Sequence, residues 1–115
     1  MIRKASDMKV QVREDMRGGK GPITFSHYFE EDEMTANARL CARLVIPPGA
    51  GIGSHPHEKE DEVYIITRGT GILDDGSTET RVDAGDAVLT GKGESHAIRN
   101  DSSEELELIA VIMRY

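Results

Sequence analysis

Cysteine is almost absent from this sequence, and so are the long apolar runs that direct a chain into or across a membrane. Cys41 is the only cysteine among 115 residues, which excludes an internal disulfide and a cysteine-rich zinc framework. Residues Met1–Val10 contain no apolar run typical of a secretion signal, and no segment approaches the ~20 apolar residues that span a bilayer. We therefore expect a cytoplasmic protein with no membrane partner.

Basic residues are also scarce relative to acidic ones. The chain has 14 Lys and Arg against 21 Asp and Glu, which gives a formal net charge of −7. The acidic runs Glu30–Glu33, Glu58–Glu62 and Asp101–Glu105 would repel a phosphate backbone, so we expect no nucleic-acid partner. Runs of this kind are typical of a solvated surface, and only Glu62 among them is a candidate for chemistry.

Helical patterns are nearly absent as well. Twelve glycines and four prolines separate short β-rich runs, which favours an all-β barrel or sandwich. The length fits one domain over residues 1–115, with residues 1–20 as an N-terminal arm or edge strand. We expect a single helical turn at Glu30–Thr35 and a hairpin at Asp75–Gly76. The predicted strands are Ile23–Phe29, Ala38–Ile46, Glu62–Thr67, Thr70–Leu73, Glu79–Val82, Ala87–Leu89, His96–Arg99 and Glu105–Met113.

Alternating apolar residues in two of these strands predict the barrel interior. Arg39, Cys41 and Arg43 have the opposite parity, and we expect them to face a covering N-terminal strand or a partner subunit. Ile109 and Val111 add a second apolar face, which favours a homodimer. The residues predicted to point inward are Leu40, Ala42, Leu44 and Ile46 on one strand and Leu106, Leu108, Ala110 and Ile112 on the other.

Two of the four histidines, His55 and His57, are separated by one residue. On an extended backbone this spacing places both imidazoles on one face, roughly 6 to 7 Å apart along the strand, so that both can approach one cation. Glu62 follows a short polar stretch, and a turn there would return the chain antiparallel beside the histidines. We expect Glu58, Glu60 and Asp61 to be solvated in that connection, and His96, on a later strand, to supply a third imidazole.

The spacing of these residues resembles the two motifs of the cupin superfamily. The first motif, G-x5-H-x-H-x4-E-x6-G, is matched without a mismatch from Gly49 to Gly69. The second, G-x5-P-x-G-x2-H-x3-N, is matched from Gly85 to Asn100 except that Gly91 stands where the family usually has proline. The resemblance implies a single-domain cupin barrel, the double-stranded β-helix or jelly roll.

The resemblance also implies that His55, His57, Glu62 and His96 bind a divalent metal ion. Three imidazole nitrogens and one carboxylate suit several metals and do not select one of them. Mn or Fe is favoured if the site is octahedral and leaves two positions open. Zn, Ni, Co or Cu could also occupy the site. A group of ordinary polar barrel residues without metal is the alternative, although buried imidazoles would then need other partners.

Three features outside the motifs have two readings each. His27 shares a face with Phe25 and is either a packed structural residue or an acid–base group that reaches the pocket. Tyr64 has the parity of Glu62 and either packs or bonds to a metal-bound substrate. The segment Arg17–Gly21 suggests a phosphate-binding loop but lacks the required spacing, so we expect a flexible loop.

The resemblance favours an enzyme that binds and transforms a small carboxylate or related oxygen-rich metabolite, of the oxalate decarboxylase or dioxygenase type, with Tyr64 and His27 as the candidate catalytic residues. The alternative is a non-catalytic binding module for a sugar or organic acid. A third option, isomerisation of a phosphorylated sugar, requires cationic side chains near the metal, and Arg43 or Arg81 in the pocket would favour it.

Overall fold

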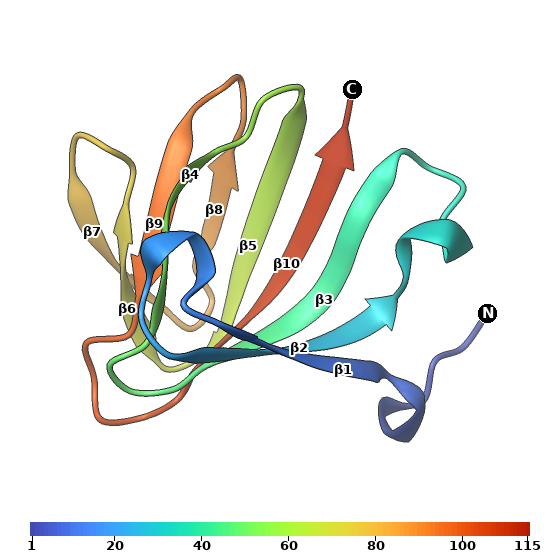
Figure 1. Cartoon of the computed structure of the whole chain (residues 1–115), viewed down its shortest axis with the longest axis horizontal. Coiled ribbons are helices and arrows are strands. Elements are labelled where there is room, and N and C mark those ends of the chain that lie inside the picture. The colour runs from blue at the N-terminus through green and yellow to red at the C-terminus, as the bar shows by residue number, and fades with distance from the viewer.

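The computed structural model describes residues 1–115 and contains two antiparallel sheets and no α-helix (Figure 1). No helix in it is long or apolar enough to span a membrane. Three single turns of 3-10 helix are η1 (Ala5–Asp7), η2 (Met16–Gly18) and η3 (Glu31–Glu33). The strands are β1 (Lys9–Glu14), β2 (Pro22–Phe29), β3 (Ala38–Ile46), β4 (Gly51–Pro56), β5 (Glu60–Arg68), β6 (Thr70–Asp74), β7 (Glu79–Asp83), β8 (Ala87–Thr90), β9 (Ser95–Arg99) and β10 (Leu106–Arg114).

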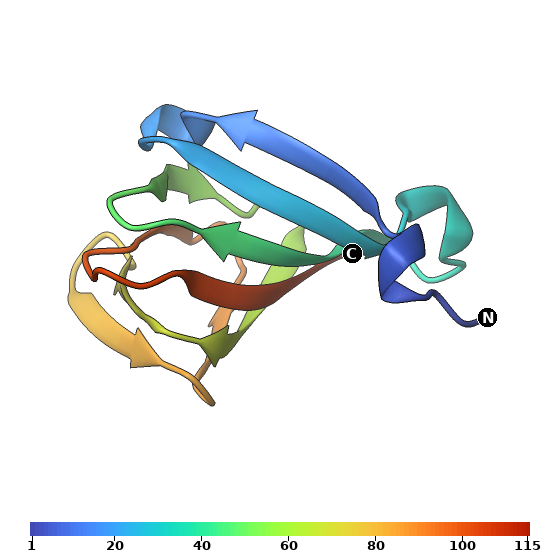
Figure 2. The same ribbon diagram turned by 90° about the horizontal axis from the view of Figure 1, so that it is seen from below.

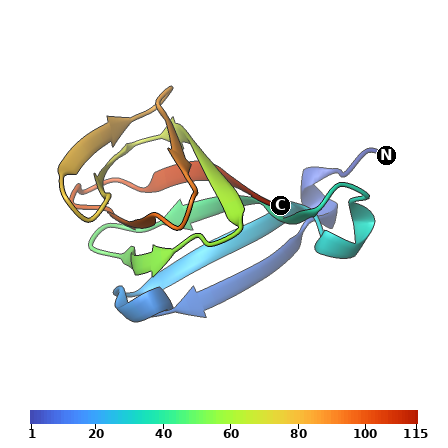
Figure 3. The same cartoon turned by 90° about the horizontal axis from the view of Figure 1, so that it is seen from above.

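The two sheets face each other across a common interior. The larger has the strand order β1-β2-β3-β10-β5-β8 and the smaller β4-β9-β6-β7. In Figures 2 and 3 the sheets curl into a barrel, and the strands β1 and β2 extend beyond it toward the N-terminus. Strands adjacent in the sequence are therefore often on opposite sheets, and the all-β, jelly-roll prediction is confirmed.

The barrel interior follows the predicted alternation on β3 and β10. All of the residues predicted to point inward are buried except Leu40, which is half-buried. The two strands pair directly, with Leu108 opposite Leu44 and Ala110 opposite Ala42. Phe25 from β2, Tyr64 and Ile66 from β5 complete the same core. Part of this apolar lining, including Phe25, Leu44 and Tyr64, also reaches the pocket described below.

Several predicted elements are present, and one strand is absent from the predicted set. The hairpin at Asp75–Gly76 joins β6 to β7, and the helical turn at Glu30–Thr35 is the single turn η3. The N-terminal arm contains β1, which pairs with β2 at the edge of the larger sheet and does not cover the outer face of β3. The extended segment that carries the first two histidines is a strand of its own, β4.

One predicted pairing is wrong. The chain does reverse between β4 and β5, with Lys59 in a left-handed conformation at the turn, but the two strands do not pair. Strand β4 pairs with β9 in the smaller sheet, whereas β5 pairs with β10 and β8 in the larger one. Glu62 therefore approaches the histidines from across the barrel. Glu62 lies within β5. Glu60, which was predicted to lie in a solvated connection, is the first residue of the same strand.

The segment Arg17–Gly21 is held against β4 and is not the flexible loop that the sequence suggested. The amide of Gly51 donates to the carbonyl of Lys20 at 2.9 Å. A Cβ atom on Gly53 would collide with the carbonyl oxygen of Arg17, and one on Gly19 would collide with that of Gly51. Glycine at these two positions therefore allows backbone-to-backbone contact, which closes the N-terminal segment over the end of β4.

Candidate metal centre

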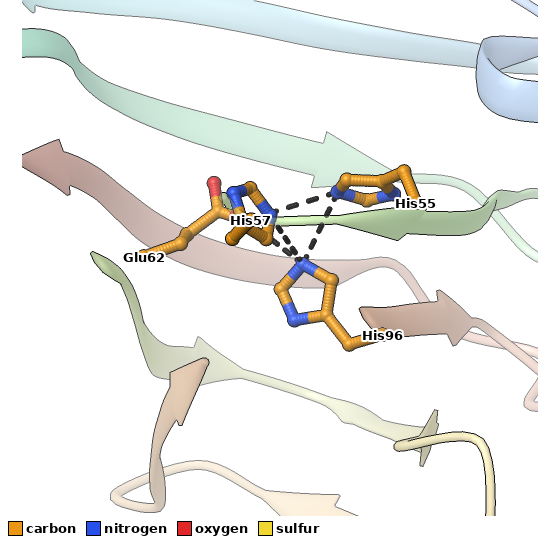
Figure 4. Close-up of side chains that lie close together, drawn as sticks. All are labelled: His55, His57, Glu62 and His96. Carbon is orange, nitrogen blue, oxygen red and sulfur yellow. Dashed lines mark hydrogen bonds and ion pairs between the residues drawn. The ribbon is translucent and has the colours of Figure 1, made fainter. Parts of the chain in front are cut away.

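Four buried side chains from three strands and one turn converge inside the barrel (Figure 4). His55 is on β4, His57 follows that strand, Glu62 is on β5 and His96 is on β9. One potential ligand atom from each lies within 4.8 Å of all the others. The structure thus brings together the complete set of ligands that the sequence predicted, in a group that could hold a metal ion.

The contacts are shortest between the Nε2 atoms and one carboxylate oxygen. His96 Nε2 lies 3.1 Å from His57 Nε2 and 3.2 Å from His55 Nε2. Glu62 Oε1 lies 2.8 Å from His96 Nε2, 2.9 Å from His57 Nε2 and 3.9 Å from His55 Nε2. A single ion placed between these atoms could contact all four of them.

The other ring nitrogen of two imidazoles donates to a fixed acceptor. His55 Nδ1–H donates to the Gly53 carbonyl and His57 Nδ1–H to the Glu60 carboxylate, each at 2.8 Å. His96 Nδ1 shares a 2.8 Å hydrogen bond with the Thr90 hydroxyl. With Nδ1 protonated, a neutral imidazole has a lone pair on Nε2, and this lone pair is what a metal binds.

Glu62 supports the same conclusion from its charge and its hydrogen bonding. Burial raises the pKa of this carboxyl, but its contacts with His55, His57 and His96 outweigh that effect and lower the pKa below its ordinary value, so the group is ionised at neutral pH. Its buried Oε1 atom has no hydrogen-bond partner. Lone pairs of two or three nitrogens facing an unpartnered carboxylate oxygen repel one another unless a cation lies between them, and the residues present therefore fit a divalent metal ion.

The pKa values of two of the imidazoles are shifted in opposite directions. Burial lowers the pKa of His57, but the carboxylates of Glu62 and Glu60 on its two sides outweigh burial and raise it. Burial dominates at His96 and lowers its pKa, in spite of the opposing effect of Glu62. A metal ion competes with protons for the same nitrogens, so His57 has the stronger proton competition of the two.

Glu60 is a positioning residue that the sequence analysis placed wrongly in solvent. Its carboxylate accepts two hydrogen bonds of 2.7 Å from the Arg39 guanidinium as well as the one from His57. The bonds to Arg39 lower the pKa of Glu60 to about 2. Arg39 in turn lies beside the pocket and not on the outer face, because it is the unpaired residue of a bulge in β3: Ile112 of β10 pairs with Leu40, and Met113 pairs with Ala38.

Both candidate catalytic residues line a pocket of about 160 Å³, together with three of the four ligands, His55, His57 and Glu62. Tyr64 is 1% exposed and stacks on the His96 ring with the centroids 4.9 Å apart. Burial and the charge of Glu62 raise its pKa well above the ordinary value. His27 Nε2 lies 2.8 Å from Gln11 Oε1, and burial and the charge of Arg13 lower the pKa of this imidazole.

The cationic residues of this pocket were not found from the sequence. Neither Arg43 nor Arg81 lines it: Arg43 lies 3.9 Å from Glu107, and Arg81 is bonded to Asp101 at 2.8 Å. Arg13, Arg17 and Arg39 line the pocket instead. A larger open groove of about 450 Å³, bordered by β4, β9 and the N-terminal loop, contains none of the four potential ligands.

Comparison with known proteins agrees with this site. The model of the family described as the Cupin domain matches residues 42–112. An oxalate-binding protein of Thermotoga maritima is 39% identical over 113 residues, which cover 98% of this chain and 93% of that protein. A solved structure of a predicted oxalate decarboxylase from T. maritima superposes with a TM-score of 0.94 and 38% identity, over 100% of both chains. The polyketide cyclase RemF from Streptomyces resistomycificus has the same fold at 19% identity, with a TM-score of 0.77 over 99% of this chain and 80% of that one.

Proposed function

We propose a function on the premise that this chain belongs to the cupin family, which the match over residues 42–112 and the 39% identical relative establish. In our proposal the chain binds a divalent metal ion through His55, His57, Glu62 and His96 and uses it to bind a small carboxylate. The observation that carries the proposal is the buried Glu62 Oε1, which lacks a hydrogen-bond partner and faces the Nε2 atoms of three histidines.

Manganese or iron is the metal we propose, with the six-coordinate geometry that these ions accept. The bound ion would act as a Lewis acid or redox centre for an oxygen-rich ligand at its open positions. The chain's own contribution is to keep Nε2 of His55 and His57 deprotonated, through the bonds from Nδ1 to Gly53 and Glu60, and to orient the His96 ring through Thr90. The pocket walls exclude bulk water, because Tyr64 and Leu44 are almost fully buried.

The proposed ligand is a small carboxylate such as oxalate. The pocket volume of about 160 Å³ is below the roughly 300–1,000 Å³ of sites for drug-sized molecules. The relative from T. maritima is named for oxalate binding, and the similarity extends over nearly the whole of both chains. A carboxylate is also the group that two open metal positions would hold through both oxygens.

Turnover of this ligand, by decarboxylation or by reaction with dioxygen, is the finer part of the proposal. Tyr64 is the candidate catalytic residue, as a hydrogen-bond donor to the bound ligand, since its raised pKa keeps the phenol protonated next to the ligand cluster. The second candidate function is a binding module without turnover, for an organic acid or a sugar. One observation favours it. His27 is the only other candidate acid–base group, and its Nε2 atom is already hydrogen-bonded to Gln11, which leaves this atom less available for proton transfer to a ligand.

Metal analysis of the purified protein tests the first step, and we expect about one Mn or Fe ion per chain. Calorimetric titration of the loaded protein with oxalate tests the second. Product assays for carbon dioxide, formate and oxygen uptake then separate an enzyme from a binding module. A protein that retains no metal, or that binds metal without binding oxalate or other small carboxylates, would contradict the proposal. A Tyr64→Phe variant that loses turnover but keeps oxalate affinity would assign the phenol a catalytic role.

We also propose a homodimer formed through the outer face of the larger sheet. Leu89, Val63, Val111 and Cys41 are opposite one another on four neighbouring strands and form an apolar row across it. Leu89 is 70% exposed. Light scattering on the protein and on a Val111→Glu variant tests this, with a dimer expected for the first and a monomer for the second. A cytoplasmic location is a proposal as well, supported by the unpaired thiol of Cys41.

A further inference from the structure

Two of the nine arginines have no carboxylate partner, and both line the pocket of the candidate metal centre. The other seven each lie within 4.0 Å of an Asp or Glu oxygen, as expected in a chain with an excess of acidic residues. These pairs are Arg3–Glu33, Arg39–Glu60, Arg43–Glu107, Arg68–Glu105, Arg81–Asp101, Arg99–Glu79 and Arg114–Glu31. The two without a partner are Arg13 and Arg17.

Arg13 is held at the pocket wall by an aromatic ring. Its guanidinium lies over the ring of Phe25, 4.4 Å from the centroid, and Phe25 is 2% exposed and lines the same pocket. Stacking of this kind uses the face of the guanidinium and leaves the N–H groups at its edge free to donate. The only protein acceptor near them is the amide oxygen of Gln11, at 3.4 Å.

Arg17 is directed by the backbone of the N-terminal loop. It has φ 53° and ψ 32°, a left-handed conformation that L-residues other than Asn and Asp seldom adopt. The loop is closed by two bonds between Asp15 and Gly21, of 3.0 and 3.1 Å, and its carbonyl groups rest against the glycines of β4. A fixed loop with an unusual backbone conformation is a feature of ligand sites, where such strain is kept because it positions a side chain.

We propose that Arg13 and Arg17 form an anion subsite at the mouth of the pocket, which binds the end of the ligand that points away from the metal. The ligand is then a small dianion, with one carboxylate at the metal and a second oxyanion group, carboxylate or phosphate, on the two guanidinium groups. Guanidinium groups match the geometry of both oxyanions and attract them to the pocket of an otherwise acidic protein. This inference rests on the proposed function, because it takes the metal-bound carboxylate as given.

The test compares dianions with monoanions of the same length on the metal-loaded protein. Calorimetry would measure binding of malonate against malonamate and of succinate against succinamate, and of phosphoglycolate for the phosphate arm. We expect at least one dianion to bind about tenfold or more tightly than its monoanionic counterpart, as charge-assisted hydrogen bonds imply. A malonate or succinate preference identifies a carboxylate at the subsite, and a stronger phosphoglycolate preference identifies a phosphate.

The variant R13Q/R17Q should reduce that preference to about twofold or less while its metal content and its affinity for acetate stay at the wild-type values. R68Q/R81Q is the matched control, because it removes the same two charges from exposed sites outside the pocket and should leave the preference intact.

Three outcomes overturn the inference: no dianion preference in the wild type, a preference that survives in R13Q/R17Q, or an equal loss in R68Q/R81Q. Loaded protein that binds acetate and oxalate, but that binds malonate and succinate no more tightly than malonamate and succinamate, contradicts the subsite alone. Protein that retains no metal contradicts the proposed function as well.

Discussion

The floor and the mouth of one pocket are built in opposite ways. At the floor, His55, His57 and His96 are buried, and each has a protein partner on the ring nitrogen that faces away from the cluster. At the mouth, Arg13 and Arg17 are exposed, come from the N-terminal segment and have no carboxylate partner. The floor belongs to the barrel strands and the turn after β4. The mouth is added by β1, which carries Arg13, and by the following loop, which carries Arg17 and rests on β4.

The difference separates metal binding, which the cupin barrel supplies, from the selection of an anion, which the N-terminal segment of this chain adds. A group of ligands that must bind an ion needs fixed rotamers and a dry environment, which only the interior provides. A group that must select and release a small anion needs access to solvent and an unsatisfied charge. Substitutions at the floor should therefore change metal retention, and substitutions at the mouth should change ligand preference with the metal still bound.

The largest effect is expected from His57→Ala, which removes an imidazole from the floor. We expect the metal content to fall to background in a barrel that remains folded, since the other three ligands leave the ion exposed to exchange. Elemental analysis together with circular dichroism would measure this. His27→Ala is the matched control at the mouth and should keep the wild-type metal content. Equal metal content in both variants would remove His57 from the ligand set.

A smaller effect is expected one step behind the floor, at Glu60→Gln. The amide can still accept a hydrogen bond from His57, but it carries no charge and pairs less well with Arg39. Loss of such an outer partner lowers metal affinity about 10- to 100-fold in known metal sites. Competition with a chelator would measure the affinity, and Glu58→Gln, an exposed neighbour, should leave it unchanged. The positioning role is wrong if the two variants bind metal equally well.

The sequence was sufficient to predict the four ligands at the floor of the pocket. It was not sufficient to predict Glu60, which positions one of them, or the two arginines at the mouth. The ligands could be found because H-x-H on a strand and a Glu at a set spacing are local patterns. Glu60 was missed because its strand begins directly after a left-handed turn at Lys59, which the acidic run hides. Arg17 was missed because its position depends on a glycine of β4 more than thirty residues away. Arg13 was missed because it lies over Phe25 of the neighbouring strand, a contact that no local pattern predicts.

The pairing of the strands could not be predicted in full, because it also depends on contacts between residues far apart in the sequence. Short turns favour pairing of neighbours, and β1 with β2, β2 with β3 and β6 with β7 do pair in this way. Strand β10, however, lies between β3 and β5, which are far from it in the sequence. Alternation predicted the buried faces of β3 and β10 correctly except at Arg39, but it contains no information about the neighbouring strand.

An intermediate effect is expected where the mouth is attached to the barrel. Gly53→Ala places a Cβ atom against the carbonyl oxygen of Arg17, so the N-terminal loop must move away from β4. We expect a loss of about 1–3 kcal/mol in the free energy of unfolding, as for overpacked sites, and a loss of dianion preference with the metal retained. Urea unfolding and calorimetry would measure the two. Ser54→Ala, at the exposed neighbouring position, should change neither. A variant with unaltered anion preference would show that the loop does not position Arg17.

The smallest effect is expected at His27, the one titratable imidazole of the mouth. Burial, followed by the charge of Arg13, lowers its pKa below the ordinary value of 6.5. A lowered pKa in the folded state means that the unfolded chain takes up the proton first as the pH falls. The contribution of His27 to stability is therefore fully present above pH 6.5 and is lost as the pH falls through the folded-state pKa. His27→Gln should flatten this part of the pH profile of urea unfolding, and Arg13→Gln should raise the pKa of His27 measured by NMR titration. A His27 that titrates at or above 6.5 would contradict both expectations and would place this imidazole in open solvent, outside the influence of the guanidinium beside it.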